Sequence, residues 1–201
     1  MYTWNEEKHT EEMQYVNIED WRVHANSSYG GAQGSYKGVT NEELTVRIEK
    51  AGTGYKDDWD NWLNWGIQIR LPNRTAYKRL EAGKTYEMTI SYHTTQDGLM
   101  RVKCEGNDPI LTKYRDNRTY PNPSEYTKEG YHEDGIGHYP ATAGYNTITE
   151  TFVYSDAFAH GQNDASIVLM PCPSQGDVEG NGFGDGTIIS DISISFDEVT
   201  S

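Results

Sequence analysis

Basic residues are scarce in this sequence. Only 17 Lys and Arg stand against 31 Asp and Glu among 201 residues, which gives a formal net charge of −14. A nucleic-acid-binding protein needs a basic surface that neutralises phosphates, so the balance argues against DNA or RNA as a partner. The same charge disfavours anionic membranes and strongly anionic substrates, because like charges repel.

Long apolar runs and cysteines are also few. No stretch approaches the roughly 18 consecutive apolar residues of a membrane-spanning helix, so no membrane segment is expected. The segment Tyr2–Gln14 is acidic and polar, unlike a signal peptide. Two cysteines, Cys104 and Cys172, are too few for a disulfide-rich scaffold or for a zinc site with about four ligands. They form either one bridge or two free buried thiols.

Familiar catalytic motifs are missing as well. The sequence contains no nucleophile elbow, phosphate-binding glycine loop, dinucleotide fingerprint or zinc-binding His-Glu-x-x-His helix. A β-sandwich glycosidase would need two carboxylates across a cleft, and the best strand bearing carboxylates, Asp191–Asp197, is better explained as structural. An enzyme therefore stays an alternative only because a fold does not decide a function.

Aromatic residues, by contrast, are abundant, at 12% of the chain with 15 Tyr against 4 Phe. An acidic disordered chain would lack them. Many aromatic and aliphatic residues alternate with polar ones, as Tyr86, Met88, Ile90 and Tyr92 do. This period of two is typical of strands with one face on a core and one face in solvent.

The alternation predicts an all-β protein. The expected strands are residues 20–25, 44–49, 64–71, 85–93, 100–104, 148–154, 165–170 and 188–197. No window of a dozen residues carries a helical stripe, and a short helical turn within 5–13 is the one helix expected. Glycine-rich turns between short strands indicate an antiparallel β-sandwich, a jelly roll of about 8–10 strands.

Two polar segments interrupt this rhythm. Residues 52–64 carry Trp59 and Trp62 among Asp and Asn, and residues 105–146 form a long Tyr-rich loop insertion. A segment of that length without strand signals is often functional. We expect residues 1–15 to be an N-terminal extension and residues 16–201 to be one β-sandwich domain.

Large rings in polar loops usually mark a binding surface. Flat aromatic faces stack on sugar rings, while amide, guanidinium and imidazole groups bond sugar hydroxyls, so the pattern favours a neutral polysaccharide or oligosaccharide. The alternative is that Trp59 and Trp62 fold back to cap the sandwich, because Trp is buried on average. We expect a carbohydrate site formed by Trp59, Trp62, Gln68, Arg70, His93, Arg101, Tyr126 and Tyr131.

Four motifs, in order along residues 16–198, resemble the jelly-roll carbohydrate-binding modules of the family 4, 9 and 22 (galactose-binding-like) group. The segment Val16–Trp21 is similar to their opening Asn-x-Phe-Glu-Asp, and Trp65–Ile69 to their central Trp-x-x-Gln strand. The segment Leu80–Tyr92 matches their Leu-x-x-Gly-x-x-Tyr strand, and Ile189–Ile194 their closing Ile-Asp-Asp-Val-x-Leu.

The resemblance implies a non-catalytic domain that tethers a secreted enzyme or cell-surface protein to a polysaccharide, with Gln68 facing a groove across one sheet. A β-glucan or hemicellulose is the favoured ligand, and an α-glucan such as starch is compatible. A monomer within a multidomain extracellular or surface-attached protein is expected. The alternatives are a glycoside hydrolase or polysaccharide lyase on a jelly-roll fold, and a structural or adhesin surface domain.

The resemblance also implies a structural Ca²⁺ between the first and last strands, with Glu19 as a ligand. Where the family's closing motif has its first Asp, this chain has Ser190, which leaves Asp191 as the substitute ligand on the opposite strand phase.

Overall fold

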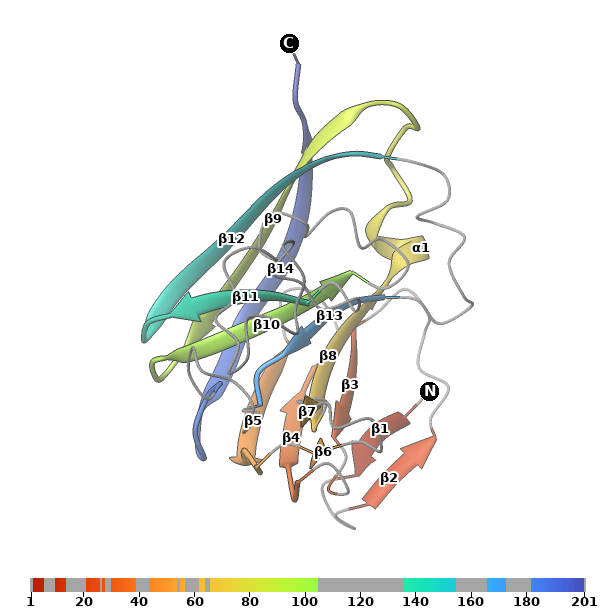
Figure 1. The fold of residues 1–201 in the computed structure, drawn as a ribbon. Helices are drawn as coiled ribbons and strands as arrows, with labels where there is room; N and C mark the ends of the chain where they lie inside the picture. Colours follow the sequence, from red (N-terminus) through yellow and green to blue (C-terminus); the bar gives the residue numbers. More distant parts are fainter. Residues whose placement is uncertain are drawn as a thin grey trace.

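The computed structural model describes residues 2–5, 10–13, 21–25, 27, 30–38, 44–53, 55–56, 62–63, 66–104, 136–154, 166–172 and 182–200. Two five-stranded antiparallel sheets form its two layers (Figure 1). The expected antiparallel β-sandwich is therefore confirmed. Among the described residues, no helix has the length and apolar character needed to cross a membrane.

The first layer, called the β8 sheet here, has the strand order β11-β10-β13-β8-β3. Its strands are β11 (Ile136–Ala141), β10 (Gly98–Cys104), β13 (Ser166–Met170), β8 (Ile67–Pro72) and β3 (Arg22–Ala25). The second layer, the β9 sheet, has the order β12-β9-β14-β5-β4. Its strands are β12 (Gly144–Val153), β9 (Thr85–Thr94), β14 (Ile188–Glu198), β5 (Thr45–Lys50) and β4 (Gln33–Lys37).

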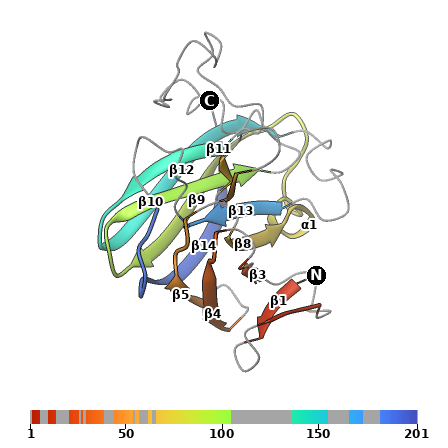
Figure 2. The same cartoon turned by 60° about the horizontal axis from the view of Figure 1, so that its bottom comes forward.

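Smaller elements accompany the two layers. A hairpin of β1 (Tyr2–Asn5) and β2 (Thr10–Met13) lies beside the N-terminus, below the sandwich in the view of Figure 2. A second pair joins β6 (Tyr55–Lys56) to β7 (Trp62–Leu63), and α1 (Asn73–Ala76) follows β8. The sequence predicted a helical turn within 5–13, but Asn5 and residues 10–13 belong to the strands of the first hairpin, and residues 6–9 lie outside the described part of the chain.

The core lies between the two sheets. Ile67, Ile69 and Leu71 of β8 belong to the same buried cluster as Met88 and Ile90 of β9. Alternation therefore sorts each strand into an inward apolar face and an outward face, as the sequence predicted. Several aromatic residues enlarge this core, which compensates for the shortage of aliphatic side chains; those buried include Trp21, Tyr77, Tyr86, Tyr92, Tyr139, Phe152, Tyr154 and Phe183.

Strand β4 is one that the sequence did not predict. It contains no Val, Leu, Ile or Ala, and its second residue is a glycine, Gly34. A Cβ atom at Gly34 would lie 2.9 Å from Cδ1 of Ile67, so this glycine makes room for an isoleucine from the opposite sheet. β4 is defined by its backbone pairing with β5, which the residue pattern within β4 does not reveal.

The C-terminal part of the expected loop insertion, 105–146, forms strands in the structure. Residues 136–141 form β11 at the edge of the β8 sheet, and β12 of the other sheet already begins at Gly144. Its earlier residues, 105–135, lie outside the described part of the chain.

The two cysteines are separate and both buried. Cys104 ends β10 and Cys172 follows β13, and each is a free thiol. Of the two alternatives left by the sequence, the structure shows the pair of free buried thiols.

Candidate functional site

The outward face of the β8 sheet gathers polar side chains from neighbouring strands. Gln68 and Arg70 alternate with the inward Ile67, Ile69 and Leu71 of β8, so they face away from the core. On the adjacent strand β3, His24 pairs in register with Gln68 and Arg22 with Arg70.

The outward side chains of β8 are followed across the sheet by those of β13 and β10. Val168 of β13 pairs with Arg70 on one side and with Lys103 on the other, and Met170 pairs with Arg101. Val168 and Met170 form a small buried cluster apart from the main core, as expected for the outer side of a sheet. We call the outward residues Arg22, His24, Gln68, Arg70, Arg101 and Lys103 the polar face. It spans four strands, or about 14 Å at about 4.8 Å per strand.

Hydrogen-bond donors dominate the polar face. Four of its six side chains are Arg or Lys, one is His and one is Gln, and no described outward position on β3, β8, β13 or β10 is acidic. In a chain with a net charge of −14, this is a local concentration of cationic donors. Such donors form stronger hydrogen bonds than neutral ones do.

Gln68 and Arg70 are held together. Nη1 of Arg70 donates a hydrogen bond of 2.7 Å to Oε1 of Gln68. Gln68 is 4% exposed, whereas Arg70 is only partly buried. The buried amide therefore orients the guanidinium.

Arg101 has a different position from the one expected for a ligand contact. It is 1% exposed, and its Nη1 donates a 3.0 Å hydrogen bond to the carbonyl oxygen of Cys172. This bond fastens β10 to the segment that follows β13. Burial raises the pKa of the Cys172 thiol to about 12, although the nearby Arg101 acts in the opposite direction.

His93 lies on the other side of the sandwich. It alternates with the inward Tyr92 and Thr94 of β9, so it faces outward from the β9 sheet and away from Gln68, Arg70 and Arg101. Its imidazole packs edge-on against the ring of Tyr145, with ring centroids 4.9 Å apart and an interplanar angle of 74°. The structure thus divides the expected site residues between two opposite faces.

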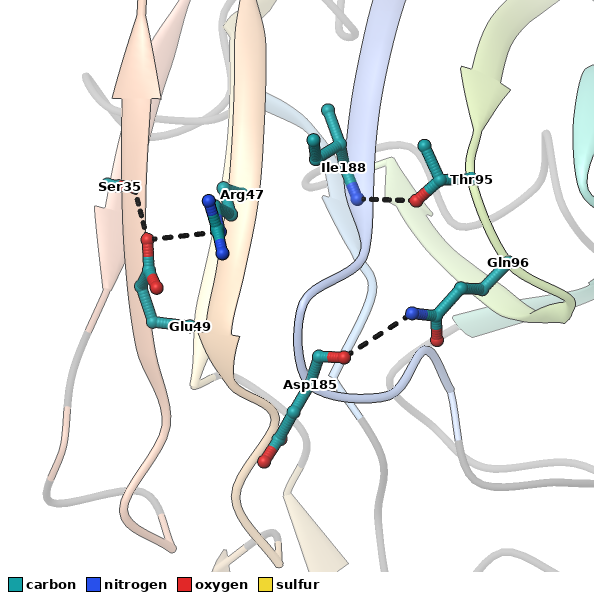
Figure 3. A network of polar contacts seen from close by, with 7 residues as sticks. All are labelled: Ser35, Arg47, Glu49, Thr95, Gln96, Asp185 and Ile188. Carbon is teal, nitrogen blue, oxygen red and sulfur yellow. Dashed lines mark hydrogen bonds and ion pairs between the residues drawn. The ribbon is translucent and has the colours of Figure 1, made fainter.

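A shallow cavity of about 280 Å³ lies on the same outward face as His93, at the β4–β5 end. It is lined by Ser35, Tyr36, Lys37, Thr45, Arg47, Glu49 and Ile188. Within it, the Ser35 hydroxyl donates a 2.9 Å hydrogen bond to Oε1 of Glu49, and Nε of Arg47 lies 3.4 Å from the same oxygen (Figure 3).

The side chains of the remaining expected site residues, apart from Asp191, lie outside the described part of the protein. Trp59, Tyr126, Tyr131 and Glu19 lie outside the described residues, and for Trp62 only the backbone, in β7, is described. Their roles stay predictions.

Asp191, the other expected calcium ligand, is exposed at a bulge of β14 with a φ of 52°. Its Oδ2 accepts hydrogen bonds from the Tyr145 hydroxyl at 3.3 Å and the Ser190 hydroxyl at 3.4 Å. Within the described residues, no group of three or more His, Cys, Asp or Glu side chains could hold a metal ion. Since Glu19 is not among those residues, the calcium site stays a prediction.

Sequence reasoning missed four residues of these two faces. Arg22, His24 and Lys103 were visible as outward positions, because each alternates with an inward apolar residue such as Val23 or Val102. Tyr145 was assigned to the loop insertion, although its alternation with Ile148 and Phe152 places it in phase with the outward threonines of β12.

No family model matches the chain, and no curated protein matches it in sequence. Among solved structures, it is similar to the N-terminal cellulose-binding domain of β-1,4-glucanase C from Cellulomonas fimi. The two are 14% identical, 92% of this chain and 95% of that one are covered, and the TM-score is 0.42.

Two further solved structures are similar at the same level. The module CBM1 of BiXyn10A is 12% identical, with 92% and 95% of the two chains covered and a TM-score of 0.39. The CBM22-1 xylan-binding domain of Xyn10C from Paenibacillus barcinonensis is 8% identical, with 90% and 87% covered and a TM-score of 0.30. By their names, these structural neighbours of the chain are carbohydrate-binding modules.

Proposed function

We propose that this chain is a non-catalytic carbohydrate-binding module and that a neutral polysaccharide chain lies across its polar face. The observation that carries the proposal is the composition of this face, where three strands of one sheet contribute six hydrogen-bonding side chains and no carboxylate. A β-glucan or hemicellulose is the favoured ligand, with an α-glucan also compatible.

The spacing between the strands of the sheet suits an extended sugar chain that lies across them. The partly buried donors His24 and Arg70 lie on neighbouring strands about 4.8 Å apart, and Lys103 lies two strands beyond Arg70, across the apolar outward residues of β13, so a chain that crosses the strands passes all three. Sugar hydroxyls are uncharged acceptors and donors, and cationic N–H groups bond to them without a neutralising anion.

The individual side chains have different roles in this proposal. Arg70, partly buried and oriented by Gln68, presents its guanidinium to a sugar hydroxyl. His24 and Lys103, also partly buried, extend the contact on either side. Gln68 and Arg101 act mainly as positioning residues, because both are almost fully buried. Stacking by Trp59, Trp62, Tyr126 and Tyr131 is proposed on sequence grounds alone.

The composition of the polar face favours binding over hydrolysis. Glycosidases of the common retaining and inverting kinds need two carboxyl groups flanking the scissile bond. The described outward positions of β3, β8, β13 and β10 supply none. We propose that any catalysis belongs to another domain of a longer extracellular or surface-attached protein, which this module would tether to the polysaccharide.

Affinity electrophoresis over β-glucan, xylan, mannan and starch tests the proposal. At least one polysaccharide should retard the protein, and Arg70→Ala should weaken that binding by about tenfold or more, since a charge-assisted hydrogen bond is lost. Arg79→Ala, at an exposed turn position after α1, is the matched control and should leave the binding unchanged.

Two results would contradict the proposal. One is the absence of retardation by every polysaccharide in the panel. The other is the release of reducing ends or unsaturated products from the same polysaccharides, which would indicate the alternative, a hydrolase or lyase.

A further inference from the structure

The ring of Tyr145 is the most exposed large apolar side chain among the described residues, at 76%. It lies at the start of β12, on the outward face of the β9 sheet and thus opposite to the polar face. Covering the face of a tyrosine ring removes apolar area from water, which favours a ligand that stacks on it.

Two neighbours hold this ring in place. His93 packs edge-on against it, and Asp191 accepts a hydrogen bond from its hydroxyl at 3.3 Å. The Asp191 carboxylate lies on the β14 bulge, so two strands of the sheet fix the ring from two sides. A ring that is already oriented loses less entropy when a ligand stacks on it.

Hydrogen-bonding residues continue from this ring across the sheet. Tyr145 pairs in register with His93, and His93 pairs with Ser190 of β14. Ile188, two residues before Ser190, pairs with Arg47 of β5, and Arg47 pairs with Ser35 of β4. Both Ile188 and Arg47 line the 280 Å³ cavity, so the band reaches from the exposed ring to the cavity over all five strands.

The cavity presents donors and acceptors side by side. Arg47 and Glu49 form an ion pair, with side chains 56% and 41% exposed, and Ser35 bonds the same carboxylate (Figure 3). A neighbouring donor and acceptor match two adjacent sugar hydroxyls, each of which both donates and accepts. A free anion would be repelled by Glu49.

A protein partner fits this surface less well. Specific protein interfaces bury about 1,200–2,000 Å² around an apolar centre. The outward residues between Tyr145 and the exposed Val153 at the end of β12 are Thr147, Thr149 and Thr151, and their neighbours on β9 and β14 are Ser91, Thr89, Glu87, Ser193, Ser195 and Asp197. This row of short polar and acidic side chains beside one exposed ring lacks the apolar centre of a protein interface.

We propose that the outward face of the β9 sheet is a second carbohydrate-binding surface, on which Tyr145 stacks on a sugar ring and the band from His93 to Arg47 bonds its hydroxyls. The ligand class, a neutral polysaccharide chain, rests on the proposed function of the polar face. With one surface on each side of the sandwich, a single module holds two chains, or two parts of one chain, and gains avidity on a polysaccharide.

Calorimetric titration with cellohexaose, xylohexaose and maltohexaose tests the second surface. The unmodified chain should bind two molecules of at least one of these hexasaccharides. Arg70→Ala and Tyr145→Ala should each retain one, and the double variant should retain none. Tyr145→Phe keeps the ring but loses the bond to Asp191, so its affinity should fall less than that of Tyr145→Ala, which should lose about tenfold or more at this surface.

Val153→Ala provides the matched control. Val153 is 59% exposed and lies on the same face of the same strand, eight residues from Tyr145. Its truncation should leave both sites intact.

The outcomes separate the two proposals. One bound molecule in the unmodified chain, lost in Arg70→Ala and unchanged in Tyr145→Ala, overturns the second surface and leaves the polar face standing. Binding that is lost in Tyr145→Ala and unchanged in Arg70→Ala overturns the polar face and supports the surface proposed here.

Discussion

Arg70 and Arg101 lie on the same face of the same sheet, separated by β13, and yet they differ in burial. Arg70 is partly buried and is oriented by Gln68, so its guanidinium can reach a ligand. Arg101 is almost fully buried and bonds a backbone carbonyl. Strand phase predicted that both side chains face outward, but it could not predict their depth, because depth depends on what lies over the sheet.

The buried thiol of Cys172 makes the stability of the protein depend on pH. Burial raises the pKa of its thiol to about 12, while an unfolded cysteine titrates near 8.5. The native state therefore keeps a proton that the unfolded state loses, and its stability should fall as the pH rises from about 8.5 to 12. Burial also raises the pKa of Tyr92, which acts in the same direction at higher pH.

Urea unfolding at pH 7 and pH 10 measures this effect. Cys172 should contribute about 1–2 kcal/mol to the loss of stability at pH 10. Cys172→Ala should therefore lose less stability between the two pH values than the unmodified chain does. An equal loss in both proteins would show that the thiol is not protected by folding.

Among the secondary-structure elements, the sequence predicted some strands and missed others. The strands with strong alternation, such as β9 and β8, were found by their residue pattern. β4 was missed because its inward positions are Gly34 and Tyr36 rather than aliphatic residues. β11 was missed because Gly137 and Pro140 conceal its alternation. β4 and β11 both lie at edges of the two main sheets, where pairing with one neighbour defines the strand.

The turn after β5 gives a prediction at this scale. Gly52 has a φ of 74°, and a Cβ there would lie 2.8 Å from the backbone nitrogen of Ala32 and from the oxygen of Gly30. The same turns are joined by a 3.0 Å hydrogen bond from the Thr53 N–H to the Gly30 oxygen. Gly52→Ala therefore introduces both backbone strain and a clash with backbone atoms, which cannot rotate away.

Gly83→Ala is the matched control for Gly52→Ala. Gly83 has a similar φ of 83°, but no atom lies within 4 Å of its Cβ position. It should cost only the left-handed backbone penalty of about 1–2 kcal/mol, and Gly52→Ala should cost clearly more. Urea midpoints compare the two variants, and equal losses would argue against the close approach of the turns.

The whole molecule has one main core shared by both sheets. Residues of β3, β8, β10, β11 and β13 belong to the same buried cluster as residues of β5, β9, β12 and β14. A shared core couples the layers, so neither sheet should unfold while the other stays native.

Ile90→Ala tests this coupling. Ile90 is fully buried on β9, and its truncation should cost about 2–5 kcal/mol. Hydrogen exchange followed on peptides from β9 and from β8 should then report the same decrease in opening free energy. A decrease confined to the β9 sheet would show that the two layers unfold separately.

The sequence by itself determined the class of the fold and the face of each strongly alternating strand, because a period of two is a local property that burial imposes on every half-buried strand. The tertiary structure decided which outward residues meet. It placed Gln68 beside Arg70 and His24 on one sheet, and Tyr145 beside His93 and Asp191 on the other. Strand order arises from pairings between distant segments, so no local pattern could show that the expected site divides between two opposite faces.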